Sequence, residues 1–310
     1  MLARHWLVVS LLACAPAWAA DKAPFDRIVF FGTSLSDPGN AFALRGESST
    51  PPDWSVDPFL VPDRPYARGG HHFSNGATWA EQFARRLGLG GSARPAFGDA
   101  GGSNYAVGGA RAYDDGMNVN LPDQVRRFLQ DAGGEASPDS LYVVEMGGND
   151  LRDALLAAAG GGDPAAILSA ALFSISDSLM QLYVAGAREF LVWSAPDIGR
   201  TPAVGALGAA VPAGQLTVAF NAGLDGLLAQ LAPALPGVRF TRLDAYAKLN
   251  TVMANPRLFG LRNVTAACIT PSAPPFACKK ADEYLFWDGI HPTKATHGII
   301  AHEAAHIVQQ

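Results

Sequence analysis

A short apolar run decides the fold near the start of this sequence: RIVFF at residues 27–31, followed at once by Gly32, Thr33 and Ser34. A run of this length that ends at a glycine is typical of a strand buried on both faces. Comparable runs stand at residues 103–107, 140–146, 189–193 and 238–243. Helical patterns lie between and after them, at residues 78–87, 122–129, 163–185, 216–235 and 293–309. Near-continuous apolar strands that alternate with helices predict a three-layer α/β/α sandwich with a central parallel sheet.

The composition limits the class of protein. The 310 residues are 49% hydrophobic and 16% charged, with a formal net charge of −5. An average soluble domain has roughly 25% charged residues, so the chain is rich enough in apolar side chains for a large core. Disorder is excluded because it requires low hydrophobicity and dense charge. Since the sequence has no basic block to neutralise phosphates, we expect no nucleic-acid partner.

Residues 1–20 have the order of a secretory signal peptide. Arg4 supplies the positive start, WLVVSLLA at residues 6–13 the apolar stretch, and AWA at residues 17–19 the cleavage pattern. We therefore expect cleavage near Ala19 or Ala20, a secreted or periplasmic protein, and a single domain over residues 21–310. A lipoprotein site at Cys14 is the less favoured alternative. The apolar stretch is too short to span ~30 Å of hydrocarbon, so we expect no stable membrane anchor.

Cleavage would remove Cys14 and leave two cysteines, Cys268 and Cys278. An even pair in an exported chain predicts a disulfide, here closing a short Pro-rich loop. The alternative is two unrelated buried thiols.

Polar residues follow several of the predicted strands. Ser34 follows the first strand, Gly108 and Gly109 the run at residues 103–107, and GGND the strand that ends near residue 146. DGIH stands at residues 288–291, before the last helix. Ligands of such sheets bind outside the carboxyl ends of the strands, so we expect these groups to converge there. Together they are the parts of an acyl-transfer site.

Each of these residue types has a chemical role in ester cleavage. A serine hydroxyl is a weak nucleophile unless a base removes its proton, and His291 can be that base for Ser34. Asp288 can accept the other ring N–H and fix the imidazole. The negative charge that develops on the carbonyl oxygen needs donors. The candidates are the N–H of Ser34, the N–H of Gly109 or Gly108, and the amide of Asn149.

Four blocks of sequence carry a resemblance to a known family. They are GTSL at residues 32–35, NYAVGG at 104–109, GGND at 147–150 and DGIH at 288–291. On these blocks the sequence resembles the GDSL, or SGNH, hydrolase family. The resemblance implies a flavodoxin-like α/β/α fold and ester hydrolysis. It implies Ser34 as nucleophile, His291 as base and Asp288 as its partner, with an oxyanion hole made by Ser34, a glycine and Asn149.

The sequence departs from the family pattern at one position and leaves another open. Thr33 stands where the family usually has an aspartate. In the glycine block, counting from Asn104 points to Gly109, and Gly108 remains a second candidate.

Two other functions compete with ester hydrolysis. HEAAH at residues 302–306 matches a zinc-binding pattern through His302 and His306. A catalytic zinc needs a third protein ligand, however, and residues 307–310 provide none. We therefore expect neither a metal ion nor an organic cofactor. A non-catalytic binding module is disfavoured because the complete set of catalytic residue types is present.

The sequence thus predicts an exported serine ester hydrolase that acts through an acyl-serine intermediate. Lipid esters are the first expectation for its substrate, with transient contact to a lipid surface, and carbohydrate O-acetyl esters are the alternative. A long Pro-rich connection, between residues 40 and 72, either lines the substrate site or packs on the surface.

Overall fold

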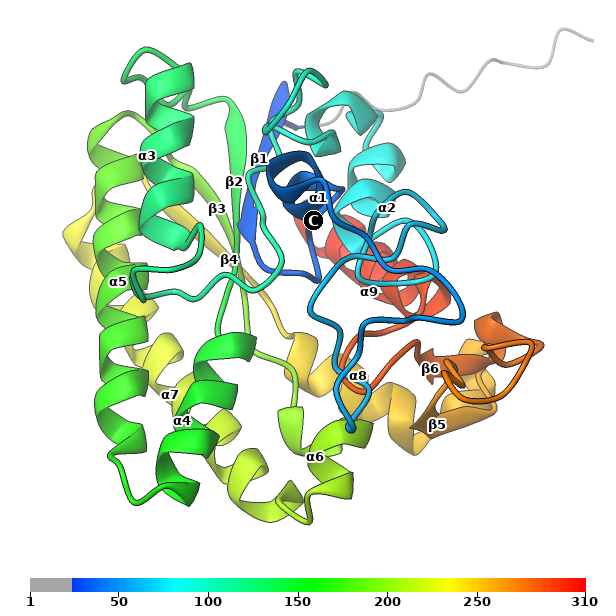
Figure 1. The fold of residues 1–310 in the computed structure, drawn as a ribbon. Coiled ribbons are helices and arrows are strands. Elements are labelled where there is room, and N and C mark those ends of the chain that lie inside the picture. The colour runs from blue at the N-terminus through cyan, green and yellow to red at the C-terminus, as the bar shows by residue number, and fades with distance from the viewer. Residues whose placement is uncertain (1–23) are drawn as a thin grey trace, which may run out of the picture.

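The central sheet contains four parallel strands in the spatial order β1–β2–β3–β4 (Figure 1). The computed structural model describes residues 24–310. The strands are β1 (Arg27–Gly32), β2 (Ser140–Glu145), β3 (Glu189–Trp193) and β4 (Arg239–Leu243). They confirm four of the predicted strands, and each end lies within one residue of its predicted position. Because the strands are parallel, their carboxyl ends meet at one edge of the sheet.

The fifth predicted strand, at residues 103–107, is an extended edge segment instead. It follows β1 through three backbone hydrogen bonds: Phe30 N to Ser103 O at 3.0 Å, Tyr105 N to Phe30 O at 2.8 Å, and Val107 N to Gly32 O at 3.1 Å. Its outer side is bonded by the Asn40 side chain, whose Nδ2 donates to the carbonyl oxygens of Asn104 and Ala106, and by the backbone of residues 94–96, which forms a short parallel bridge at Asn104.

With this segment included, the chain extends from β1 in both directions along the sheet. The spatial order becomes residues 103–107, β1, β2, β3, β4. The connection therefore changes direction at β1, and ligands of open α/β sheets bind next to such a switch point. Ser34 lies two residues beyond the end of β1.

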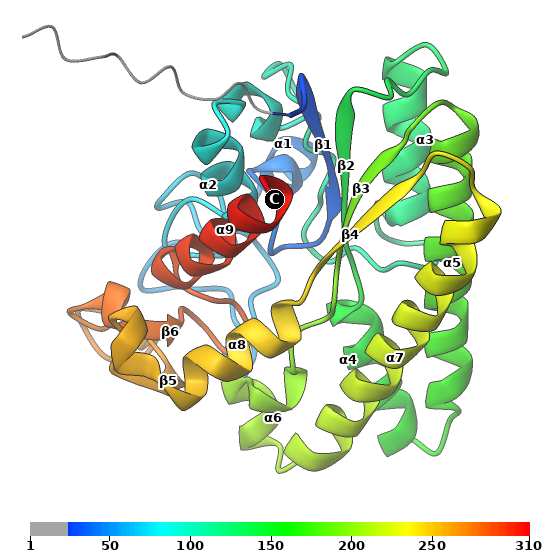
Figure 2. The same ribbon diagram turned by 180° about the vertical axis from the view of Figure 1, so that it is seen from behind.

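Helices cover both faces of the sheet, which confirms the three-layer sandwich (Figures 1 and 2). One layer holds α3 (Leu121–Asp131), α4 (Gly148–Ala159), α5 (Pro164–Val184) and α7 (Ala210–Ala234). The other holds α2 (Trp79–Arg86) and α9 (Lys294–Val308). Alternate strand residues enter the two cores, with Phe31 and Tyr142 on the first side and Phe30 and Leu141 on the second.

Some elements were not visible in the sequence pattern. They are α1 (Asn40–Arg45), α4, α6 (Pro202–Ala206), α8 (Ala245–Ala254) and a small parallel pair, β5 (Asn263–Ala267) with β6 (Tyr284–Phe286). Helix α7 also begins at residue 210 rather than 216, because Pro212 and Gly214 obscure its first turn. Proline is tolerated in a first turn, where the missing N–H has no helical partner.

Helix α5 is long and apolar enough to cross a membrane by length and composition alone. In the structure it belongs to the helical layer, and Leu168, Ile175 and Leu179 pack into the core beneath it. The apolar side chains on the inner face of α5 therefore pack against the rest of the core.

The predicted disulfide is present, with Cys268 and Cys278 bonded at an S–S distance of 2.02 Å. It closes the loop that follows β5. Cys268 is buried with Trp54, Tyr66 and Trp287 in a small aromatic cluster. The disulfide loop therefore packs against the segment that leads to residues 288–291.

Candidate active site

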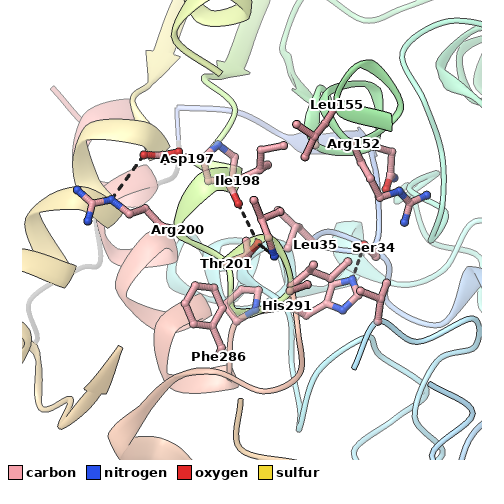
Figure 3. Close-up of a pocket in the computed structure, with 18 of the residues that line it drawn as sticks. Ser34, Leu35, Arg152, Leu155, Asp197, Ile198, Arg200, Thr201, Phe286 and His291 are labelled. Carbon is pink, nitrogen blue, oxygen red and sulfur yellow. Dashed lines mark hydrogen bonds and ion pairs between the residues drawn. The ribbon is translucent and has the colours of Figure 1, made fainter. Parts of the chain in front are cut away.

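Three side chains from distant parts of the chain form a continuous hydrogen-bonded series. His291 Nε2 lies 2.8 Å from Ser34 Oγ (Figure 3). His291 Nδ1 lies 2.8 Å from Asp288 Oδ2. Asp288 is fully buried and His291 is 3% exposed. An imidazole held in this way can take the serine proton at Nε2, while the carboxylate accepts the proton-bearing Nδ1 and stabilises the imidazolium.

A tight turn presents Asp288 and His291 together. Asp288 Oδ1 accepts from the backbone N–H groups of Ile290, at 2.9 Å, and His291, at 2.7 Å. Gly289 N donates to Leu60 O at 2.8 Å. A Cβ at position 289 would lie 2.1 Å from Phe59 O, so only glycine fits against this loop. The turn is therefore docked on the Pro-rich segment.

Tyr66, from the Pro-rich segment, is a site residue that the sequence analysis did not identify. Its hydroxyl donates to Asp288 Oδ2 at 2.8 Å, the same oxygen that faces His291. Burial and the neighbouring Asp288 carboxylate raise the pKa of Tyr66 well above its ordinary value, so the phenol remains a donor. Trp54 and Trp287 pack edge-on against the Tyr66 ring. The Asp288 carboxylate oxygen is thus bonded by both the Tyr66 hydroxyl and the His291 ring.

The two candidate glycines differ in the use of their backbone amides. Gly108 N donates to Asp37 Oδ2 at 2.8 Å, so this N–H is already occupied. Within residues 24–310, neither Ser34 N nor Gly109 N has an acceptor. Gly108 has a packing role instead, because a Cβ there would lie 2.1 Å from the ring of Phe73. The loop after β1 therefore offers a free backbone donor at Ser34, and the loop with the two glycines offers one at Gly109.

Asn149 reaches the same site from the first turn of α4. Its Nδ2 donates to Ala110 O at 2.8 Å, which leaves one of its two amide hydrogens for a ligand. Gly147 caps the helix with φ +112°, and a Cβ there would lie 2.5 Å from the Phe220 ring. The glycine before the helix thus sets the position of Asn149. The positive end of the helix dipole also favours negative charge at this point.

A cavity of about 540 Å³ opens over these groups, with Ser34, Asn149 and His291 in its lining. Its walls are mostly apolar and come from α4, α6, α8 and the segment before His291. The apolar lining includes Leu155, Leu156, Ile198, Val204, Leu207, Leu249, Met253, Leu285 and Phe286. Phe59 and Val61 of the Pro-rich segment also line it, so this segment does contribute to the site, while Gly108 and Gly109 lie in an adjoining cavity.

Comparison with known proteins agrees with this arrangement. A family model described as GDSL-like Lipase/Acylhydrolase matches residues 28–304. The chain belongs to this family. It is 26% identical to phosphatidylcholine-sterol acyltransferase of Aeromonas hydrophila, over 99% of this chain and 97% of that protein. It is 28% identical to a GDSL esterase/lipase of Arabidopsis thaliana, over 88% of this chain and 83% of that protein.

The fold has a counterpart among solved structures. An acetylxylan esterase from Geobacillus stearothermophilus matches it with a TM-score of 0.50 at 15% identity, over 93% of this chain and 97% of that one. This similarity supports the fold. Membership of the GDSL family makes the protein a carboxylic ester hydrolase.

Thr33, which stands where the GDSL pattern usually has an aspartate, is hydrogen-bonded to a carboxylate from β2. Glu145, at the end of that strand, accepts from Thr33 N at 2.9 Å, from Thr33 Oγ1 at 3.1 Å and from Ser36 Oγ at 3.0 Å. Trp79 Nε1 in turn donates to Ser36 Oγ at 2.8 Å. Burial raises the pKa of Glu145 to about 7. The carboxylate that fixes this GDSL turn therefore comes from the neighbouring strand.

Asp37 joins the loop that contains Ser34 to the loop that contains Gly108 and Gly109. Its carboxylate accepts from the backbone N–H groups of Gly39, Asn40, Ala41 and Gly108, at 2.6 to 3.1 Å. Burial raises the pKa of Asp37 to about 6, although these four donors oppose the shift. No local sequence pattern indicates this role, because the partner Gly108 is 71 residues away.

The competing zinc pattern on α9 has a different environment. His302 and His306 are exposed, and Glu303 forms an ion pair with Lys248 at 2.5 Å. Among residues 24–310, no group of three histidine, cysteine, aspartate or glutamate side chains is arranged to hold a metal ion. The histidines belong to the solvent-facing side of a helix whose alanines and isoleucines pack against the sheet.

Proposed function

We propose that this protein is an exported serine esterase that cleaves the acyl esters of lipids, with Ser34, His291 and Asp288 as its catalytic residues. The observation that carries the proposal is the pair of 2.8 Å hydrogen bonds that joins these three side chains beneath an apolar cavity. Residues 21–310 form its single domain, and residues 1–20, which lie outside the described residues 24–310, are its signal peptide.

In the proposed reaction, Ser34 Oγ attacks the ester carbonyl carbon as His291 Nε2 takes the serine proton. The carbonyl oxygen becomes negatively charged and accepts hydrogen bonds from Ser34 N, Gly109 N and the Asn149 amide. His291 then returns the proton to the departing alcohol, which leaves an acyl group on Ser34. Water, activated by the same imidazole, hydrolyses this intermediate and restores the serine.

The apolar walls of the cavity support a lipid acyl chain over a small acetyl group. An acyl chain of ten carbons buries far more apolar surface than acetyl, at roughly 0.8 kcal/mol for each buried CH₂. The similarity to a phosphatidylcholine-sterol acyltransferase also favours lipid esters. The disulfide between Cys268 and Cys278 supports export, because such bonds persist in oxidising compartments.

A series of esters tests this function. We expect the kcat/KM of purified protein to rise from acetyl to octanoyl p-nitrophenyl esters, and to fall by at least 10³-fold in Ser34→Ala. Activity that survives Ser34→Ala and is lost on chelation would point to metal catalysis. Tight ester binding without turnover would identify a binding module. Preference for acetylated xylan over every lipid ester would replace the lipid assignment with carbohydrate deacetylation.

A further inference from the structure

Arg152 is a cation without a partner in the wall of the active-site cavity. It lies on α4, three residues after Asn149, and lines both the cavity over Ser34 and the adjoining cavity that holds Gly109 (Figure 3). Its side chain is partly buried. Within the part of the chain that the structure describes, its guanidinium makes no hydrogen bond and no ion pair within 4.0 Å.

The carboxylates nearest to Arg152 are satisfied by other donors. Asp153 forms a two-bond pair with Arg111, at 2.8 and 3.0 Å, and accepts the hydroxyl of Tyr113 at 3.1 Å. Asp57 accepts the backbone N–H groups of Phe59 and Val61, at 2.8 and 2.9 Å. Neither carboxylate therefore neutralises Arg152 at contact distance.

The surroundings of Arg152 make an unpaired charge unfavourable. Desolvation by burial and the nearby positive charge of Arg111 lower the pKa of Arg152, and the negative charges of Asp153 and Asp57 only partly oppose this shift. A guanidinium that is partly removed from water gains most when an anion supplies charge-assisted hydrogen bonds. The cavity wall thus holds a site that a negatively charged ligand would complete.

The position of Arg152 relates this site to the reacting ester. Residues three apart on a helix lie on one face, about one turn from each other, so Arg152 and Asn149 face the cavity about 5 Å apart along α4. The next turn of the helix gives Leu155 and Leu156 to the apolar part of the same cavity. Along one helix face the cavity therefore offers an oxyanion donor, a cation and an apolar wall.

We propose that Arg152 binds an anionic oxygen group, phosphate or carboxylate, on the alcohol side of the scissile ester, which makes acyl esters of anionic alcohols the preferred substrates. This inference rests on the proposed function of the site. In a glycerophospholipid the phosphate follows the ester by a few bonds, a distance that matches the spacing of Asn149 and Arg152. Arg152 then selects the substrate and takes no part in bond cleavage.

The test compares two soluble esters with the same acyl chains, dioctanoyl phosphatidylglycerol and neutral dioctanoylglycerol. We expect Arg152→Gln to lower the ratio of their kcat/KM values about 10- to 100-fold, as the loss of a charge-assisted pair predicts. Arg152→Lys should keep part of the preference. Octanoyl lactate and its methyl ester form a second pair, which distinguishes a carboxylate from a phosphate preference.

Arg200 provides the matched control, because it lines the same cavity but is exposed and pairs with Asp197 at 3.7 Å. In Arg200→Gln the ratio should change less than twofold. An Arg152→Gln ratio within twofold of wild type, or a loss no larger than that of Arg200→Gln, overturns the inference. The proposed function fails separately, if wild-type protein cleaves none of the four esters or if Ser34→Ala remains active.

Discussion

Glu145 accepts the backbone N–H of Thr33 at 2.9 Å, directly before Ser34, the proposed nucleophile. The carboxylate is buried, and its partners are two hydroxyls and one amide rather than a cation. Its charge is therefore balanced only by dipoles, which explains why burial raises the pKa of Glu145 to about 7. The protonation state of Glu145 therefore affects the hydrogen bonds that hold the turn at Ser34.

Replacing Glu145 by glutamine should change how stability depends on pH. A glutamate with a folded pKa near 7, against an unfolded value near 4.5, holds its proton longer in the folded state. Its contribution to stability is therefore present at low pH and is lost as pH rises from about 4.5 to about 7. Glu145→Gln has no such loss, so its free energy of unfolding relative to wild type should rise across this range, by on the order of 3 kcal/mol.

Urea unfolding of both proteins at pH 5 and pH 8 measures this difference. Burial raises the pKa values of Asp37 and Asp150 to about 6. Their contributions to the stability of the folded protein therefore also decrease as pH rises. The pKa of His297 is lowered by burial to about 3, which acts in the opposite direction. Asp37 and His297 are present in both proteins, so their contributions cancel in the comparison. The charge of Asp150 also raises the pKa of Glu145, so the measured difference includes this coupling. A difference that stays constant with pH would contradict the assignment to Glu145.

Tyr66→Phe should slow turnover without weakening substrate binding. The variant removes the hydroxyl that donates to Asp288 Oδ2 and leaves a buried carboxylate with one donor fewer. We expect kcat to fall about tenfold, which corresponds to about 1.4 kcal/mol, with KM within about twofold because Tyr66 does not line the cavity. Tyr105→Phe is the control, since that hydroxyl donates to Asp131 instead. Equal losses in both variants would mean that only general packing was disturbed.

The strands and the side chains of the proposed catalytic site could be predicted because each depends on a local pattern. Apolar runs such as residues 189–193 form β3 wherever the rest of the chain lies, and Ser34 and His291 belong to short motifs beside predicted strand or helix ends. Tyr66 could not be found in this way, because its partner Asp288 is 222 residues away and no pattern links the two. Glu145 was hidden for a similar reason, as the last residue of an apolar strand.

One of the helices that were missed, α4, has a start that locally resembles a turn. Helix α4 starts at a glycine pair and an asparagine, which locally favour a turn, and tertiary packing of Leu151 and Ala154 decides in favour of the helix. The choice between Gly108 and Gly109 likewise depended on a distant contact. The structure favours Gly109, because the Gly108 amide donates to Asp37.

Removing the disulfide should destabilise the protein by about 3 kcal/mol, the typical effect of closing a short loop. The bond joins residues ten apart in sequence, and Cys268 packs beside Tyr66 and Trp287. The double variant Cys268→Ala with Cys278→Ala, compared with wild type by urea unfolding, measures the loss. Wild type under reducing conditions should match the variant. Insensitivity of wild type to reductant would show that the bond contributes little to stability.

Asn149→Ala tests the proposed oxyanion donor. An amide that contacts the carbonyl oxygen only as negative charge develops should affect kcat and leave KM nearly unchanged, and loss of one such donor costs about 10²–10³ in turnover. Asn149 also donates to Ala110 O, so the variant must be shown to fold by its unfolding free energy. Asn255→Ala, which removes an exposed amide at the end of α8, is the control and should keep the wild-type kcat. If Asn149→Ala raised KM by as much as it lowered kcat/KM, the amide would be binding the ground state of the ester, and the oxyanion assignment would pass to Ser34 and Gly109 alone.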